Sequence, residues 1–335
     1  MLEIYWSRMK KIGILGGGVW GSALAKLLSN SKVCIFSRNE KIVNSINEHR
    51  FNPKLKYAVF NNNVRATLDL TDLQKTDYLV IALPTQNIRE VLKKYSTNKK
   101  SLQIIIASKG IEIETKLFLK DVVREFIKTE NISILSGPCF SQEVAQNLPT
   151  AVTLASSDRK IFNDISKLFE SKKFRVYYSD DLIGCQLGGA IKNIYAIAAG
   201  ITVGLNLGEN AKSALISRSF VEISRICKAL KAKSDTLLGL SGLGDLILTC
   251  NSLKSRNTKF GNLIASQQQI SIEEHLKAKE TTEGYYTVKA VKKIADEKNI
   301  DMPIMEAVYN ILYNHSSIND EINKLLNRPL TDEFF

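Results

Sequence analysis

The sequence predicts an α/β domain with a mostly parallel sheet over residues 9–181, followed by an all-α domain over residues 182–330. In the first half, short apolar runs alternate with helical patterns, which is typical of parallel strands buried on both faces. After Asp180-Asp181 the strand-like runs end and long stretches with a helical apolar period replace them. The chain is long enough for two hydrophobic cores, so we expect the domain boundary near residue 182.

The apolar runs place the elements of both domains. Strands are predicted at residues 11–16, 32–37, 77–83, 102–107 and 132–136, with a further β section at 150–155 and 174–178. Pro84 ends the third run, and Leu24, Leu27 and Leu28 share one side of a predicted helix at 20–29. In the second half, periodicity predicts helices at 192–204, 213–230, 286–298 and 303–313, with breaks at Gly208 and 241–244.

Composition excludes several classes of protein. The net charge is +12, but the lysines are dispersed and form no dense basic block, so we interpret the charge as surface charge and expect no nucleic-acid binding. An anionic substrate or cofactor would benefit from a local positive field. The five cysteines are widely spaced without a Cys-x-x-Cys pair, and only three histidines are present. We therefore expect no metal site, no disulfide framework and a reducing, cytoplasmic location.

The sequence also argues against membrane insertion and secretion. No apolar run approaches the roughly 20 residues that span a bilayer, because Lys192 and Asn193 interrupt the longest one. Glu3 and Arg8 stand where a signal peptide would be apolar. Residues 1–8 precede the first strand, and we expect them to be an extension or a loosely held tail.

A glycine motif joins the first predicted strand to the first helix. In Gly16-x-Gly18-x-x-Gly21, the first glycine permits a tight turn and the second lets the backbone approach a pyrophosphate. The third glycine lets the helix pack closely on the strand. The N-terminus of that helix favours an anion such as the pyrophosphate. This context predicts a Rossmann-type domain that binds a dinucleotide; the alternative is a glycine-rich turn that only packs.

The end of the second strand bears on the choice of cofactor. An NAD-preferring domain usually has Asp or Glu there to hold the ribose hydroxyls, whereas this chain has Ser37-Arg38-Asn39. Since an arginine can accept a 2′-phosphate, we favour NADPH over NADH. The alternative is that Arg38 stacks on the adenine and that both cofactors work, and the nearby Glu40 keeps this alternative open.

Lys192 is the only charge in an apolar stretch, and burying an ammonium group is costly unless it is paired. Oxidising a secondary alcohol requires a base, and reducing the ketone requires an acid; a desolvated lysine can serve as both. The alternative is a lysine that reaches solvent from an apolar helix.

Three other segments carry candidate site residues. Asp245 follows a glycine turn and can orient Lys192 or cap the next helix. Ser255-Arg256-Asn257 can encircle a phosphate, or can be a solvated loop. Lys109 follows a predicted strand, where a site at the end of the strand competes with a simple loop charge.

These motifs together resemble the NAD(P)-dependent glycerol-3-phosphate dehydrogenase family of the soluble bacterial type, from residue 9 to about residue 327. The resemblance rests on segments 16–21, 108–110, 136–140, 189–193, 242–246 and 255–257, with Glu283-Gly284 after them. It implies transfer of hydride between NAD(P)H and dihydroxyacetone phosphate, giving sn-glycerol 3-phosphate for glycerophospholipid synthesis. A homodimer is a further expectation from the family.

The resemblance also implies roles for individual residues. Lys192 would donate and accept the proton, Lys109 would touch substrate and nicotinamide, and Asp245 would help to position Lys192. The implied substrate-binding residues are Lys109, Gly137, Cys139, Lys192, Asp245, Thr249, Ser255, Arg256 and Asn257. The implied cofactor-binding residues are Gly16, Gly18, Val19, Trp20, Gly21, Arg38, Lys109, Ser141, Arg256, Thr281 and Glu283. Three of these depart from the usual family residues: Cys139 for Ser or Thr, Ser141 for Ala, and Thr281 for an apolar residue.

Two other functions fit parts of this pattern. A β-hydroxyacid or ketopantoate-type reductase shares a Rossmann domain, a helical domain and a lysine on a helix, but its substrates need a carboxylate clamp, which Ser255-Arg256-Asn257 does not suggest. A dinucleotide-sensing module without turnover would not need Lys192 and Asp245.

Overall fold

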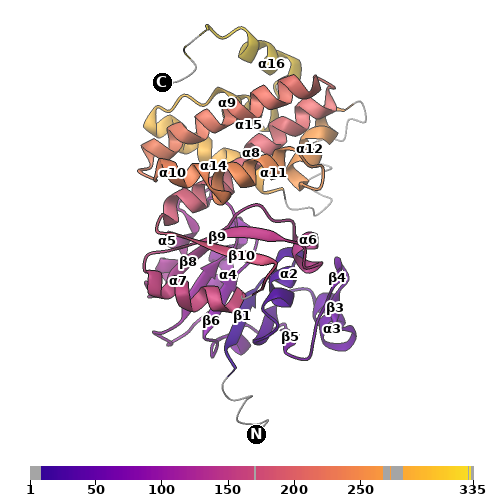
Figure 1. Ribbon diagram of the computed structural model, residues 1–335. Coiled ribbons are helices and arrows are strands. Elements are labelled where there is room, and N and C mark those ends of the chain that lie inside the picture. Colours follow the sequence, from indigo (N-terminus) through magenta and orange to yellow (C-terminus); the bar gives the residue numbers. More distant parts are fainter. Residues whose placement is uncertain (1–8, 170, 267–271, 273–281, 331, 333–335) are drawn as a thin grey trace.

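The computed structural model describes residues 9–169, 171–266, 272, 282–330 and 332. The expectations for residues 1–8 and for Thr281 fall outside the described residues. In Figure 1 the strands occupy one half of the molecule and the long helices the other. The predicted fold class, a mostly parallel α/β domain followed by a helical domain, is confirmed.

One eight-stranded sheet forms the framework of the first half, in the order β10-β9-β8-β7-β6-β1-β2-β5. All neighbouring strands pair in parallel except β8 and β9, which are antiparallel. The strands are β1 (Lys11–Leu15), β2 (Lys32–Phe36), β5 (Val64–Thr67), β6 (Tyr78–Ile81), β7 (Gln103–Ile106), β8 (Ile132–Ser136), β9 (Thr150–Ser156) and β10 (Phe174–Ser179). The apolar runs in the sequence do not predict β5, a short strand that pairs with β2 at the edge of the sheet.

Helices cover both faces of the sheet, as apolar parallel strands require. One core gathers Leu24, Ile42 and Ile165 against one face of the sheet. The other gathers Ile88 and Leu119 against the opposite face. The helices are α2 (Val19–Leu27), α3 (Glu40–His49), α4 (Ile88–Lys94), α5 (Leu119–Phe126), α6 (Ser141–Ala145) and α7 (Arg159–Ser166), and a hairpin of β3 (Phe51–Asn52) and β4 (Leu55–Val59) follows α3.

Helix α8 (Leu182–Gly204) forms the centre of the helical half. It begins ten residues before the predicted start at 192, with the Asp181 side chain accepting a hydrogen bond from Gly184 N–H at 2.8 Å. The glycines near its start look like helix breakers in the sequence, but they serve packing: a Cβ on Gly188 would lie 2.4 Å from the Ser241 carbonyl oxygen.

The remaining helices pack around α8 and share one core with it, through residues such as Ile223, Phe260, Val288 and Met305. The predicted helix at 303–313 is confirmed, while two others begin three to five residues earlier than predicted. These helices are α9 (Gly208–Ala229), α10 (Ser234–Leu238), α11 (Asp245–Cys250), α12 (Arg256–Ala265), α14 (Glu283–Lys298), α15 (Pro303–Tyr313) and α16 (Ile318–Leu326).

Helix α8 also corrects one expectation about apolar runs. Within the part of the chain that the structure describes, this 23-residue helix is long and apolar enough to cross a membrane, despite Lys192. However, 89% of its most apolar window is buried inside the protein. The core helix of a folded domain meets the same criterion, and the packing of α8 against its neighbours accounts for its composition.

Candidate active site

The glycine motif forms the turn between β1 and α2. Gly16 has a φ of +123°, a conformation that favours glycine, and its N–H donates to the Phe36 carbonyl oxygen at 3.1 Å. A Cβ on Gly21 would lie 1.9 Å from the Gly16 oxygen, so only glycine allows the helix to approach the turn. A Cβ on Gly18 would meet nothing within 4 Å. The turn therefore leaves open space at the N-terminus of α2, which suits a pyrophosphate.

Several predicted cofactor residues lie around this turn. Val19 is the first residue of α2, and the Trp20 indole donates to the Ala107 carbonyl oxygen at 3.0 Å. Arg38 is exposed just after β2, and its neighbour Asn39 caps α3 by accepting from Ile42 N–H at 3.3 Å. Ser141 is the first residue of α6.

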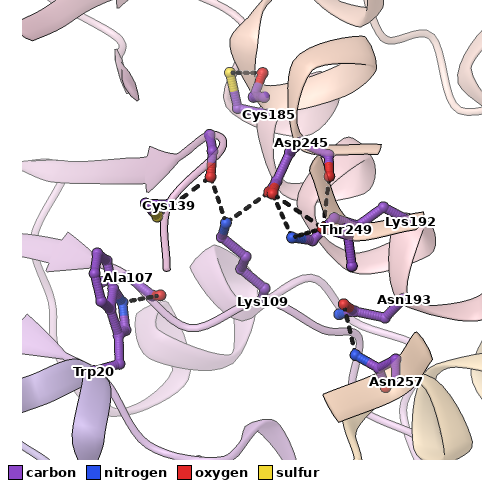
Figure 2. Close-up of polar contacts among 12 residues, drawn as sticks. Trp20, Ala107, Lys109, Cys139, Cys185, Lys192, Asn193, Asp245, Thr249 and Asn257 are labelled. Atoms are coloured by element: carbon purple, nitrogen blue, oxygen red, sulfur yellow. Dashed lines mark hydrogen bonds and ion pairs between the residues drawn. The ribbon is translucent and has the colours of Figure 1, made fainter. Parts of the chain in front are cut away.

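Lys192 belongs to a polar cluster that is centred on the Asp245 carboxylate (Figure 2). Its Nζ donates to Asp245 Oδ1 and, at 2.8 Å, to Thr249 Oγ1. Only 7% of Lys192 is exposed, and Asp245 is completely buried. Lys192 therefore does not reach for solvent. The capping alternative for Asp245 is wrong as well, because Gly244 occupies the N-cap position of α11 and no side chain caps that helix.

Lys109 enters the same cluster from the end of β7. Its Nζ donates to Asp245 Oδ2 at 2.6 Å and to the Gly137 carbonyl oxygen at 2.8 Å. The Cys139 thiol donates to the same carbonyl oxygen at 3.3 Å. The structure thus joins Lys109, Gly137 and Cys139 from the sheet to Lys192 and Asp245 from the helices, and Lys109 is not a simple loop charge.

The pKa values of the two lysines are shifted in opposite directions. Burial lowers the pKa of Lys192, and the Lys109 ammonium lowers it too, although the Asp245 carboxylate opposes both effects. For Lys109, burial lowers the pKa, but the Asp245 and Cys139 side chains outweigh it, so the pKa is raised. Lys109 therefore keeps its charge more firmly than Lys192, and of the two lysines Lys192 gives up its proton more readily.

The segment Ser255-Arg256-Asn257 starts α12, and two of its side chains have partners within the protein. Ser255 caps the helix by accepting from Thr258 N–H at 3.3 Å. Asn257 Nδ2 donates to Asn193 Oδ1 at 2.9 Å, and Asn257 Oδ1 accepts from Gly284 N–H at 2.9 Å. Both side chains are buried, so they are not part of a solvated loop, whereas Arg256 is exposed.

Comparison with known proteins agrees with this geometry. Sequence models described as the NAD-dependent glycerol-3-phosphate dehydrogenase N-terminus and C-terminus match residues 11–162 and 181–323. A relative in Zymomonas mobilis named "Glycerol-3-phosphate dehydrogenase [NAD(P)+]" is 40% identical over 326 residues, covering 96% of this chain and 94% of the relative.

The chain belongs to the NAD-dependent glycerol-3-phosphate dehydrogenase family. A family member of the same name in Thermotoga sp. is 41% identical over 325 residues, covering 96% of this chain and 98% of its own. The crystal structure of glycerol-3-phosphate dehydrogenase from Coxiella burnetii superposes with a TM-score of 0.89 at 33% identity, over 96% of this chain and 99% of that one.

Ketopantoate-type reductases, the alternative that the sequence leaves open, are similar to this chain in fold only. A ketopantoate reductase from Ralstonia eutropha superposes with a TM-score of 0.59 at 14% identity, over 93% of this chain and 99% of that one. Because the two families share this fold, the order of the domains alone does not distinguish a glycerol-3-phosphate dehydrogenase from a ketopantoate-type reductase.

Glu283 links the two halves of this dehydrogenase-family chain. It is the first residue of α14, and its Oε1 accepts from Thr85 N–H at 3.2 Å. Burial raises its pKa to about 7, although hydrogen bonds from Thr85 and the charge of Arg256 oppose the rise. No motif in the sequence indicates Thr85; the available signal is its position shortly after β6, at the carboxyl edge of the sheet.

Proposed function

We propose that this chain reversibly reduces dihydroxyacetone phosphate to sn-glycerol 3-phosphate with a nicotinamide dinucleotide. The buried contact of Lys192 and Lys109 with the single carboxylate of Asp245 carries this proposal. Membership of the family indicates which substrate the chain uses. The Gly16–Gly21 turn leaves open space that fits the pyrophosphate of the cofactor.

The cluster accounts for the proton chemistry. Bound NAD(P)H supplies the hydride, so the protein has to deliver a proton to the carbonyl oxygen. Lys192, whose pKa burial lowers, donates that proton in reduction and accepts it in oxidation. Asp245 and Thr249 hold its ammonium group in place, while the charged Lys109 stabilises negative charge that develops on the oxygen.

The substrate is proposed to lie between the sheet edge and the helical half. Gly137 and Cys139 line its edge on the side of β8, beside the Lys109 ammonium. The exposed guanidinium of Arg256 binds the phosphate, because it can form two hydrogen bonds to it at once. Ser255 and Asn257 shape that site and complete it where their groups reach the phosphate.

The cofactor is proposed to be NADPH in preference to NADH. The end of β2 presents the exposed Arg38 guanidinium, which suits a 2′-phosphate. The remaining contacts come from both halves of the chain: Gly16, Gly18, Val19, Trp20, Gly21, Lys109 and Ser141 from the first, and Arg256 and Glu283 from the second.

The proposal also covers the roles of the two domains, the oligomeric state and the cellular location. Residues 9–181 bind the dinucleotide and residues 182–330 complete the substrate site, since the last strand ends at Ser179 and α8 begins at Leu182. We also propose a cytoplasmic homodimer that supplies glycerophospholipid synthesis. The five free thiols are consistent with a reducing compartment.

Loss of absorbance of the reduced nicotinamide with dihydroxyacetone phosphate tests the reaction directly. We expect turnover with NADPH, slower turnover with NADH, and none with a ketoacid panel that includes ketopantoate. A folded protein that binds NADPH but reduces only a ketoacid would overturn the proposal. Light scattering after size-exclusion chromatography tests the homodimer.

A further inference from the structure

Asn52, on β3 of the hairpin, is a buried amide that none of the roles above uses. It is 0% exposed. Its Nδ2 donates to the Gly17 carbonyl oxygen at 3.0 Å and to Ser22 Oγ at 2.7 Å. Its Oδ1 accepts from Lys54 N–H at 2.9 Å. Both amide hydrogens and the amide oxygen therefore have partners, and two of the three bonds go to the glycine turn and the first turns of α2.

The bond to Gly17 fixes the direction of a backbone donor. The Gly17 carbonyl and the Gly18 N–H belong to one peptide plane, and in a trans peptide these two groups point in opposite directions. Because Asn52 holds the carbonyl, the Gly18 N–H points away from Asn52. A Cβ added to Gly18 would meet nothing within 4 Å, so the space around this residue is open. The donor is thus aimed away from the packed interior at the N-terminus of α2.

The hairpin that carries Asn52 is itself held firmly. Leu55 and Ala58 on β4 are buried in the core that α2 shares with the sheet. The Lys26 ammonium on α2 donates to the Tyr57 carbonyl oxygen at 2.8 Å and to the Ala145 carbonyl oxygen at 2.7 Å. These contacts tie β4 to α2 and α6, which lie beside it in Figure 1. Asn52 is therefore a fixed support for the turn.

We propose that Asn52 is a positioning residue for the cofactor, holding the Gly17–Gly18 peptide so that the Gly18 N–H meets the pyrophosphate. This inference rests on the proposed dependence on NAD(P)H. The pyrophosphate is common to NADPH and NADH, so Asn52 acts equally on both, whereas Arg38 distinguishes them. It does not touch the group that exchanges the proton.

The test measures cofactor affinity without the ketone, by fluorescence titration with NADPH and with NADH. For Asn52→Ala we expect the Kd to rise about tenfold or more for both cofactors and by the same factor, because a charge-assisted hydrogen bond is lost. The kcat at saturating cofactor and the KM for dihydroxyacetone phosphate should change little. Asn52→Asp keeps the volume but sets a carboxylate against the Gly17 oxygen, and it should weaken binding at least as much.

Ser22→Ala is the matched control, because it removes one partner of Asn52 and leaves the bond to Gly17. We expect a smaller rise in Kd for this variant. The proposal is overturned if folded Asn52 variants keep the Kd within about twofold, if they lose kcat with an unchanged Kd, or if neither folds, which would make Asn52 a folding residue only. Wild-type protein that binds NADPH but does not reduce dihydroxyacetone phosphate would contradict the proposed reaction and leave this test readable.

Discussion

Asp245 and Lys192 form a buried ion pair in which Lys192 Nζ donates to Asp245 Oδ1. The same carboxylate accepts from Lys109 at 2.6 Å, so a single negative charge faces two ammonium groups. Such a cluster is costly to bury, and removing its carboxylate would leave two like charges together. Burial lowers the pKa of Lys192, and the Lys109 ammonium adds to this effect against the Asp245 carboxylate. The surplus positive charge favours an anionic substrate.

Replacing Lys192 by Met should remove the proton donor while keeping most of the aliphatic stem. We expect kcat to fall by about 10²–10⁴-fold, the usual range for loss of a positioned acid or base. Asp245 keeps Lys109 as its partner, so the fold should survive. The affinity for NADPH, measured by titration, should persist because the glycine turn is unchanged. Turnover at the wild-type rate would contradict the assignment.

Replacing Asp245 by Asn should shift the pH dependence of ketone reduction. The carboxylate raises the pKa of Lys192 against the effect of burial, so its loss lowers that pKa further. Reduction needs the protonated lysine, and kcat/KM should therefore begin to fall at lower pH than in the wild type. Thr249→Val is the control, because it removes a neutral partner of Lys192. An equal shift in both variants would show that charge is not the cause.

The sequence could predict the fold class and the cluster because their signals are local or carried by whole motifs. Buried parallel strands are apolar throughout, and a lone lysine such as Lys192 stands out in an apolar helix. The start of α8 was missed because Gly188 serves a contact with Ser241, which is distant in the sequence. Asn52 and Thr85 were missed for the same reason: their partners Gly17 and Glu283 lie 35 and 198 residues away.

Arg256 and Ser255 should respond differently to replacement by Ala. Arg256 is exposed, so Arg256→Ala should raise the KM for dihydroxyacetone phosphate about tenfold or more and leave the melting temperature nearly unchanged. Ser255 caps α12, so Ser255→Ala should cost about 0.5–2 kcal/mol of stability. Steady-state kinetics and thermal melts measure both. An unchanged KM in Arg256→Ala would remove the phosphate role.

Arg38→Asp should reverse the cofactor preference. The carboxylate repels the 2′-phosphate of NADPH but can accept hydrogen bonds from the ribose hydroxyls of NADH. We expect the Kd for NADPH to rise far more than that for NADH, measured by titration of each. Glu40→Gln is the control, since Glu40 is the nearby exposed carboxylate at the start of α3. Equal weakening of both cofactors by Arg38→Asp would mean that Arg38 only stacks on the adenine.

Glu222 predicts a pH dependence of stability in the helical half. It is 2% exposed and accepts from the N–H groups of Ile304 at 2.7 Å and Met305 at 3.1 Å, and from the Tyr195 hydroxyl at 3.0 Å. Burial raises its pKa from 4.5 to about 7, although these hydrogen bonds and the charge of Arg225 oppose the rise. The folded chain therefore binds this proton more tightly than the unfolded chain does.

The stability that Glu222 contributes by protonation is fully present below pH 4.5 and is lost as the pH rises through about 7. Glu222→Gln cannot ionise, so its melting temperature should fall less than that of the wild type across this window. At the acidic end the variant should be the less stable protein, because the amide cannot accept all three hydrogen bonds. Glu209→Gln is the control on the same helix, since the Glu209 side chain is 83% exposed. If the melting temperatures of wild type and Glu222→Gln change by the same amount between pH 4.5 and 7, Glu222 does not titrate in this window.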